Sequence, residues 1–546
     1  MKMIYFFSAF FCLLAWLSPN HYQPWLSVYQ DSSMFVAALL LASSLLNQKS
    51  IHVPYILTFF IFLSFIPLIQ YYLGIVYFFG EAITFFFYLL ALATVFIVGF
   101  NIAQLERSNK DNIIAGFFIT ILIASMISVW IQLRQWLLFD GNIWIVDMPP
   151  NGRPFANMAQ PNQLSTLLIM GVLSVLYLFE KHKINNISAS LATIFILFGV
   201  VLTQSRTAWV FAICILIWWL IKIRVHTRLR MRYLITWVGV FVTLWFCLPY
   251  FSELLGITSI RSLSDRATAG LERWSMWHQL IMILPNAPLQ GYGWGQLNVA
   301  QILNQSDYDQ YPVFGYSHNL FLDILIWNGL LFGGAISLFI LFFLLKMALS
   351  AKDNESIVIL AVVGAILVHS MFEYPFAYAY FLLPMGFFLG FLYAQQNRDI
   401  RSLSIQKKWY VLHLVYCASL MAVFAYDYKR IEHEHELMRY ENVKLRNIDL
   451  KNIEPDVILL TQLRDYIWFV RQPLLADKSE QELDRMRKIV YRFPERPMLY
   501  RYIQTLYLNG QTEEANKVLN FFNTLYKEKL TLLLIQQRLE YEKSNK

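Results

Sequence analysis

Long, continuously apolar runs recur through the first 425 residues, and they leave this chain few possible folds. Residues 113–130, 233–249 and 320–345 have, or nearly have, the roughly 20 apolar residues with which a helix crosses a bilayer. None of these runs shows the alternation of apolar and polar residues that is typical of membrane β-barrel strands. The sequence therefore predicts an all-α, polytopic transmembrane helical bundle.

About 12–13 spans can be drawn along the chain. With 57% apolar and only 15% charged residues, the chain does not have the composition of a soluble globular protein. The first span follows a lysine, as in a signal peptide, but it lacks a small-x-small cleavage site, so an uncleaved helix is expected. The spans lie near residues 3–17, 32–46, 52–70, 79–100, 113–138, 162–179, 188–203, 207–221, 233–249, 319–345, 356–371, 376–394 and 409–425.

The cysteines and the net charge exclude two other classes of site. Cys12, Cys214, Cys247 and Cys417 all fall inside predicted spans, so neither a disulfide framework nor a zinc site is expected. The net charge of +8 follows from where the basic residues lie relative to the membrane and does not predict nucleic-acid binding. The partner that composition does predict is a lipid bilayer.

Basic residues sort to one side of the predicted membrane. With the N-terminus inside, the inside loops carry 17 Lys and Arg and the outside loops carry 5. This asymmetry is the positive-inside signature of membrane proteins. It predicts that residues 250–317 and the tail from 426 onward face the outside.

Every basic residue near the predicted outer face, apart from the tail, is an arginine. Guanidinium presents a planar fork that matches phosphate bidentately and stays charged, which makes phosphate binding one explanation. The alternative is pairing with Asp140, Asp147, Asp265 or Glu272, or contact with lipid headgroups. The six outer arginines are Arg134, Arg153, Arg206, Arg261, Arg266 and Arg273.

The chain divides into two predicted domains. Residues 1–425 form a transmembrane catalytic domain with a large outer loop at 250–317, and residues 426–546 form an outer helical domain. The tail is predicted to hold helices near 427–447, 455–472, 478–492, 495–509, 512–526 and 528–543. The segment from Pro494 to Leu519 resembles one tetratricopeptide-type helix-turn-helix, and the alternative is a plain helical bundle.

Two outer segments offer polar groups beside the membrane. Arg153, Asn157, Gln160 and Gln163 precede or begin the sixth span and could bind sugar hydroxyls or phosphate, although helix capping would explain one of the amides in this segment. Arg206 stands in a tight turn between two spans, where a charge is costly unless it is paired or functional.

The strongest candidate base is His318, which ends the 250–317 loop beside Asn319 at the start of an apolar run. A histidine, with its usual pKa of about 6.5, can accept a proton at neutral pH or orient a hydroxyl. Glu373 and Tyr374 lie on a neighbouring outer turn and could position an acceptor. A lone histidine is more often structural, but the arginine-bearing loop before His318 favours a role in a site.

These motifs together resemble a known family. The matching elements are Arg273-Trp274-x-x-Trp277, Pro288-Leu289-x-Gly291-x-Gly293, Ser317-His318-Asn319 followed by Gly329, and Ser205-Arg206-Thr207-Ala208-Trp209. They resemble the O-antigen ligase/polymerase superfamily over residues 150–395. The segment from Arg153 to Gln163 and Phe372-Glu373-Tyr374-Pro375 look most like PglL-type bacterial O-oligosaccharyltransferases.

The resemblance implies a multi-pass enzyme of the bacterial inner membrane with its site facing the periplasm. Such an enzyme transfers a preassembled glycan from undecaprenyl pyrophosphate to a hydroxyl of an acceptor protein such as a pilin, with inversion and without metal or another cofactor. It implies catalytic roles for His318, Arg206 and Arg273, and substrate binding by Arg266, Tyr374 and one of Gln160 and Gln163. Arg153, Asn157, Asn319 and Glu373 complete the predicted substrate-binding set.

Two other functions stay open at the level of sequence. An O-antigen ligase or polymerase would use the same donor with a sugar hydroxyl as acceptor, and the helical tail favours a protein acceptor instead. A lipid-linked glycan transporter would distribute polar residues along its spans, whereas here they gather at one side.

Overall fold

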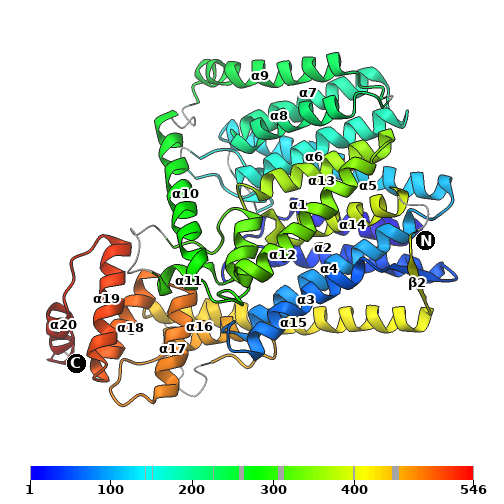
Figure 1. Cartoon of the computed structure of the whole chain (residues 1–546). Coiled ribbons are helices and arrows are strands. Elements are labelled where there is room, and N and C mark those ends of the chain that lie inside the picture. The colour runs from blue at the N-terminus through cyan, green and yellow to red at the C-terminus, as the bar shows by residue number, and fades with distance from the viewer. Residues whose placement is uncertain are drawn as a thin grey trace.

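The fold is a bundle of apolar helices with a smaller helical domain at one end (Figure 1). It is known from a computed structural model that describes residues 2–139, 141, 143–149, 152–225, 227–257, 263–304, 313–396, 400–445 and 454–544, with the backbone alone for 263–272, 396 and 542–544.

The bundle helices correspond one to one to the predicted spans. In the described residues, seven helices are long and apolar enough to cross a membrane, and six further apolar helices are shorter. The helical transmembrane class is thus confirmed, while the exact number of crossings stays a prediction. The helices are α1 (Lys2–Leu17), α2 (Val28–Ser43), α3 (Leu57–Tyr72), α4 (Phe79–Ile102), α5 (Arg107–Trp136), α6 (Pro161–Glu180), α7 (Asn186–Leu202), α8 (Arg206–Ile221), α9 (Met231–Leu254), α12 (Leu320–Ser350), α13 (Asn354–Ser370), α14 (Ala379–Gln396) and α15 (Lys407–Asn442).

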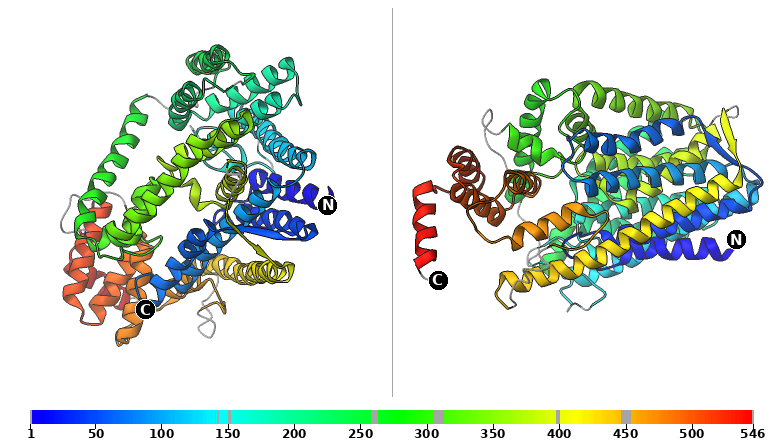
Figure 2. Two further views of the ribbon diagram at one scale, coloured as in Figure 1. Left: turned by 45° about the vertical axis from the view of Figure 1, so that its right-hand side comes forward. Right: turned by 90° about the horizontal axis from the view of Figure 1, so that it is seen from below.

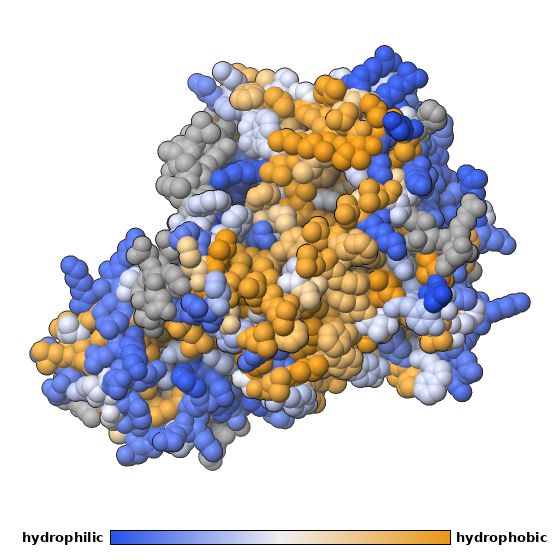
Figure 3. Space-filling model, viewed as in Figure 1, coloured by the Kyte–Doolittle hydropathy of each residue, from blue (hydrophilic) through white to orange (hydrophobic). Residues whose placement is uncertain are grey.

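The surface of the bundle is apolar where lipid is expected. Figure 3 shows a broad hydrophobic band across the middle of the molecule, with hydrophilic residues at both ends. Large side chains such as Leu338 and Phe342 on α12 are 68% and 66% exposed on this surface. A soluble protein rarely exposes so much contiguous apolar area, because its transfer into water is unfavourable. This chain is a multi-pass membrane protein.

The 250–317 segment folds against one end of the bundle. Its helices are α10 (Leu263–Ile283) and α11 (Leu297–Leu303), joined through the 3-10 turn η3 (Leu284–Asn286). In Figure 1, α10 crosses that end between α9 and α11. The remaining 3-10 turns are η1 (Ser44–Asn47), η2 (Ala156–Met158) and η4 (Pro375–Ala377). We call this end of the bundle the site side.

A small sheet at the opposite end departs from the all-α prediction. β1 (Ile51–Pro54) pairs antiparallel with β2 (Ser402–Ile405), and β2 lies near the N-terminus in Figure 1. The side chain of Asn101 holds the first strand, since it accepts from the backbone N–H of His52 and donates to its carbonyl, both at 2.8 Å. The predicted span at 52–70 was therefore wrong at its start, because α3 begins only at Leu57.

The C-terminal part begins without a break in the chain's helix. The prediction of separate helices at 409–425 and 427–447 was wrong, because α15 runs through both as 36 continuous residues. No glycine or proline interrupts this stretch, so hydropathy changes while the helix continues. The domain then continues with α16 (Thr461–Arg471), α17 (Glu480–Arg492), α18 (Arg496–Leu508), α19 (Thr512–Tyr526) and α20 (Leu532–Ser544).

The C-terminal domain packs closely on the start of α4. The backbone N–H of Gly80 donates to Oγ1 of Thr461 at 2.9 Å, and Arg492 forms an ion pair with Glu81. A Cβ at Gly80 would lie 2.5 Å from the carbonyl oxygen of Leu459, so only glycine permits this approach. Figure 2 shows the domain at the site side, beyond the ends of the bundle helices.

Candidate active site

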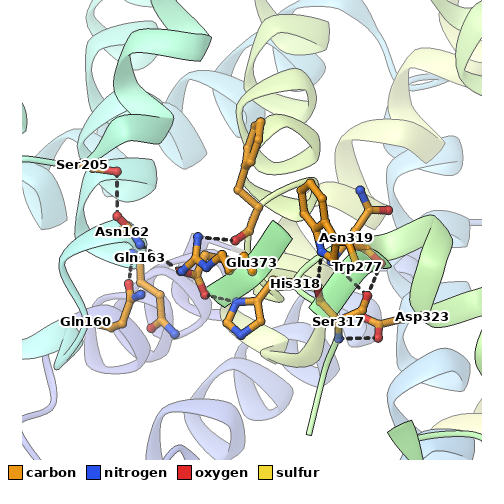
Figure 4. Close-up of polar contacts among 12 residues, drawn as sticks. Gln160, Asn162, Gln163, Ser205, Trp277, Ser317, His318, Asn319, Asp323 and Glu373 are labelled. Carbon is orange, nitrogen blue, oxygen red and sulfur yellow. Dashed lines mark hydrogen bonds and ion pairs between the residues drawn. The ribbon is translucent and has the colours of Figure 1, made fainter. Parts of the chain in front are cut away.

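The turn that carries His318 is fixed on both sides. His318 itself has a left-handed backbone, with φ of 60°. The next residue, Asn319, caps α12 by accepting from the N–H groups of Phe321 and Leu322 at 3.1 and 3.2 Å. The preceding residue, Ser317, donates its N–H to Asp323 at 2.7 Å. The predicted partner Asn319 is thus a helix cap that sets the position of the histidine (Figure 4).

Glu373 gathers three of the candidate groups around one carboxylate. Its Oε2 lies 2.8 Å from Nδ1 of His318. Its Oε1 accepts from the amide of Asn162 at 3.0 Å and pairs with the guanidinium of Arg273. Arg273 also donates to the carbonyl oxygen of Phe372 at 3.0 Å. His318, Arg273 and Glu373, predicted from three separate segments, therefore meet in one cluster.

The cluster extends to the turn before α8. Oγ of Ser205 donates to the amide oxygen of Asn162 at 2.8 Å (Figure 4). Ser205 is fully buried, and the next residue, Arg206, begins α8 with an exposed side chain. Arg206 is therefore held on the same side of the bundle as His318 and Glu373, one residue from their hydrogen-bond network.

The environment of Glu373 keeps its carboxylate charged. Burial alone would raise the pKa, but the hydrogen bond to His318 and the positive charges of His318 and Arg273 outweigh it and lower the pKa of Glu373 to about 2. An ionised carboxylate only accepts hydrogen bonds, so Nδ1 of His318 must carry the hydrogen. In the neutral ring, Nε2 is then the nitrogen that can accept a proton.

Tyr374 lies beside His318, as the sequence predicted for the same outer turn. Its ring is stacked on Tyr316, with centroids 4.6 Å apart, and its edge meets the imidazole at 5.2 Å. Burial and the charge of Glu373 raise the pKa of Tyr374, so its hydroxyl stays protonated and can donate. Tyr316, which the sequence did not single out, holds this ring.

A cavity of about 860 Å³ opens beside His318 and Tyr374. Its deep end is lined by apolar side chains such as Phe59 and Phe343, within the bundle. Its other end is lined by Gln462 and Arg492 of the C-terminal domain. The cavity therefore changes from apolar to polar along its length, and the histidine stands between its two ends in sequence and fold.

The amide-rich segment before α6 is largely occupied by structural contacts. Gln160 caps α6 by accepting from the N–H of Gln163 at 2.7 Å. The amide oxygen of Gln163 accepts from the hydroxyl of Tyr380 at 2.7 Å. Asn157 is buried and donates to the carbonyls of Leu17 and Trp144, at 2.7 and 2.8 Å. None of these contacts joins the three amides to the Glu373 cluster.

Two predicted arginines lie apart from that cluster or outside the described side chains. Arg153 donates to the carbonyl oxygen of Gln204 at 3.3 Å, which ties its segment to the turn before Arg206. Arg266 lies in α10 among the residues whose side chains are not described. Within the described part of the chain, no group of three or more His, Cys, Asp or Glu side chains could hold a metal ion.

Sequence reasoning missed Asn162 and Ser205, which connect the cluster. Asn162 stands at the second position of α6, where it was considered only as a possible helix cap; Gln160 is the cap instead. A signal was present, because both residues belong to the polar segments that flank neighbouring spans. Their partnership could not be read from the sequence, since they are 43 residues apart.

The fold and the site define a class of protein: a membrane-embedded enzyme of the O-antigen ligase type. The family model described as O-Antigen ligase matches residues 191–338, which include Arg206, Arg273 and His318. A model described as Protein glycosylation ligase matches residues 154–179, and one described as Virulence factor membrane-bound polymerase, C-terminal, matches residues 357–537.

Two curated relatives cover nearly the whole chain. A General O-oligosaccharyltransferase of Acinetobacter baylyi is 31% identical over 96% of this chain and 92% of its own length. A ComP-specific O-oligosaccharyltransferase of the same organism is 31% identical over 95% of each chain. No solved structure matches the chain. The protein belongs to the family of O-oligosaccharyltransferases, and it is a glycosyltransferase.

Proposed function

We propose that this enzyme transfers a preassembled glycan en bloc from undecaprenyl pyrophosphate to a Ser or Thr hydroxyl of a periplasmic protein such as a pilin. The observation that carries the proposal is the contact of His318 and Arg273 with one buried carboxylate, Glu373. It places a proton acceptor and a phosphate-binding group in one cluster beside a cavity that is apolar at one end.

The proposed reaction is a single displacement with inversion. The acceptor oxygen attacks the anomeric carbon while the bond from that carbon to the pyrophosphate oxygen breaks. His318 takes the hydroxyl proton on Nε2, and the resulting imidazolium is stabilised by the ionised Glu373. The products are a glycosidic bond to the acceptor and undecaprenyl pyrophosphate.

Stabilisation of the leaving group is assigned to the two arginines. Contacts with Phe372 and Glu373 use two of the five N–H donors of Arg273, so others remain for pyrophosphate oxygens. Arg206, at the start of α8, supplies a second guanidinium on the same side of the bundle. These fixed charges lower the barrier as negative charge develops, which makes a metal unnecessary.

The cavity gives the donor a place with matching polarity. The apolar end, between α3, α4, α12 and α14, suits part of a polyprenyl chain, and the polar end suits the glycan. The proposed location is the bacterial inner membrane with the site side facing the periplasm. The charge asymmetry of the loops supports this orientation, because basic residues favour the cytoplasmic side.

A polysaccharide ligase or polymerase is the second candidate. The matches to the O-Antigen ligase and membrane-bound polymerase models favour it, since both families carry the same class of site. The full-length likeness to protein-glycosylating enzymes favours a protein acceptor. A lipid-linked glycan transporter is the weakest candidate, because the charged cluster lies at one end of the bundle.

The test is expression in a bacterial host that supplies a known lipid-linked glycan and a candidate pilin. We expect the glycan on the pilin, detected by mass spectrometry of the intact protein and of its peptides. His318→Ala should abolish the modification while the protein remains folded and inserted, because no other described group of the cluster can accept the proton. Full activity of this variant would remove His318 from the mechanism.

The site of glycan attachment separates the candidates. Glycan on lipid A or lengthened on its carrier, with unmodified pilin, would overturn the protein-acceptor proposal in favour of the ligase or the polymerase. Wild-type transport without any transfer would overturn the enzyme mechanism.

A further inference from the structure

The polar end of the cavity contains three buried groups that the mechanism does not use. They are Glu81 at the start of α4, Gln462 on α16 and Trp327 on α12. Their residues are 5%, 8% and 2% exposed. The three come from distant parts of the chain, and all line the cavity that also contains His318.

One polar atom of each group has no hydrogen-bond partner among the described residues. These atoms are Oε2 of Glu81, Oε1 of Gln462 and Nε1 of Trp327. A buried polar group without a partner is unfavourable, and native proteins leave few of them. Two acceptors and one donor around a single cavity are the pattern expected where a ligand supplies the missing partners.

Arg492 adds charge and connects this region to the C-terminal domain. Its guanidinium pairs with Oε1 of Glu81 and leaves Oε2 uncommitted. The indole of Trp327 packs against that of Trp294, with centroids 5.3 Å apart, and both line the cavity. Acceptors, a guanidinium and broad aromatic faces together suit a ring that carries several hydroxyl groups.

We propose that this end of the cavity, formed by Glu81, Gln462, Arg492 and Trp327, is a saccharide subsite for the donor glycan beyond the sugar that reacts. Hydroxyls donate to the two carboxylate and amide oxygens and accept from the indole and guanidinium N–H groups. The assignment to the donor rests on the proposed function, in which the glycan arrives on a lipid. The C-terminal domain thereby contributes to substrate selection.

A peptide of the acceptor could also supply N–H groups, but the cavity favours a glycan. The same cavity continues to Phe59 and Phe343 at its apolar end, so its occupant is polar at one end and apolar at the other. A lipid-linked glycan has this polarity, whereas a segment of a secreted protein does not require it.

The experiment compares two donors in purified full-length enzyme. One carries a single sugar on polyprenyl pyrophosphate, and the other carries an oligosaccharide. Gln462→Leu removes the unpartnered oxygen at similar volume, and Arg492→Gln removes the charge. The matched control is Arg487→Gln on the same helix, whose side chain is exposed and pairs with Asp484.

We expect both subsite variants to raise the KM for the oligosaccharide donor roughly tenfold, as the loss of one hydrogen bond to a buried group predicts. The KM for the single-sugar donor and the kcat with it should stay within about twofold, and the control should match wild type. Equal effects on both donors, or a raised KM for the acceptor protein alone, would overturn the saccharide subsite; the second result would assign the cavity to a peptide.

A direct binding measurement separates this proposal from the proposed function. Free oligosaccharide released from the donor should bind the His318→Ala variant in saturation-transfer NMR, and Gln462→Leu should weaken that binding in the same background. Should Arg492→Gln fail to fold, Gln462→Leu decides the test alone. Sugar binding with transfer to a polysaccharide would contradict only the protein acceptor, whereas protein glycosylation without any sugar binding would contradict only the subsite.

Discussion

At the scale of single residues, Glu373 determines what its neighbours can do. It is buried, yet it contacts Arg273, His318 and Asn162 through its two oxygens. A buried carboxylate without such partners would be protonated, and a neutral Glu373 would no longer stabilise a positive imidazole. The acidic residue therefore sets both the hydrogen position on His318 and the orientation of the Arg273 fork.

Arg273→Lys tests whether the shape of the guanidinium matters beyond its charge. Lysine keeps the charge but cannot hold Glu373, the Phe372 carbonyl and a pyrophosphate oxygen in one plane. A lost hydrogen bond to a charged group costs about 1.5–3 kcal/mol, so kcat/KM should fall roughly tenfold or more. The measurement is the initial rate of glycan transfer at several donor concentrations.

The control for this variant is Arg487→Lys, which changes an exposed arginine in the C-terminal domain. It should transfer glycan at the wild-type rate. Wild-type turnover by Arg273→Lys itself would contradict bidentate phosphate binding.

The pKa of Glu373 predicts a stability difference at acid pH. Its pKa is lowered from 4.5 to about 2 in the folded protein. A lowered acid pKa means that the stabilisation is fully present above about 4.5 and is lost as pH falls toward 2, by roughly 3 kcal/mol in total. Wild type should therefore lose more thermal stability than Glu373→Gln when detergent-purified protein is taken from pH 5 to pH 3.

Thermal unfolding of both proteins across this range is the measurement. Glu373→Gln should be the less stable protein at pH 7, because Arg273 loses its charged partner. Parallel pH profiles for the two proteins would contradict the lowered pKa.

At the scale of elements, two motif glycines act as one contact. Gly329 interrupts α12 with φ of 74°, and a Cβ there would lie 2.3 Å from the carbonyl oxygen of Leu289. A Cβ on Gly291 would meet the backbone N of Gly329 at 2.4 Å. The turn after η3 thus packs directly on the break in α12, and the N–H of Tyr292 donates to the Ile326 carbonyl at 3.0 Å.

Gly329→Ala should destabilise this crossing and reduce activity, since α12 carries His318 at its start. Forcing a non-glycine residue into this backbone conformation costs about 1–3 kcal/mol before the clash with Leu289 is counted. Gly334→Ala is the matched control in the same helix, because a Cβ there has nothing within 4 Å. The melting temperature and the transfer rate of the two variants decide the point; equal values would contradict the role of the crossing.

At the scale of the whole molecule, the two chain ends lie at opposite ends of the bundle (Figure 1). The C-terminal domain stands on the site side, and the N-terminus lies near the small sheet. With the basic loops on the cytoplasmic side, the proposed orientation exposes residues 454–544 to the periplasm.

Protease accessibility tests this orientation. Trypsin added to spheroplasts should cleave at exposed residues of the C-terminal domain such as Lys517, whose side chain is 61% exposed. The loop between α8 and α9, with Arg224 and Arg232, should be cut only after the membrane is opened. Cleavage of that loop in intact spheroplasts would reverse the proposed orientation.

The sequence by itself determined the features that belong to single segments. The positions of the apolar helices, the sorting of basic residues and the family motifs around Arg206, Arg273 and His318 all follow from local residue order. Each bilayer helix satisfies its own backbone hydrogen bonds, so its existence is set by its own hydropathy. The same local reading predicted two helices where α15 is one, because it took a change in hydropathy for the end of a helix.

Tertiary structure alone decided which of these segments meet. It paired Arg273 with Glu373, 100 residues away, rather than assigning the amide rim of Asn157 and Gln160 to the cluster. It also placed Gln462 and Arg492 of the tail in the cavity with His318. Such contacts depend on how helices pack around small residues and on the burial of partnered charges, which are properties of the assembled bundle and not of any one segment.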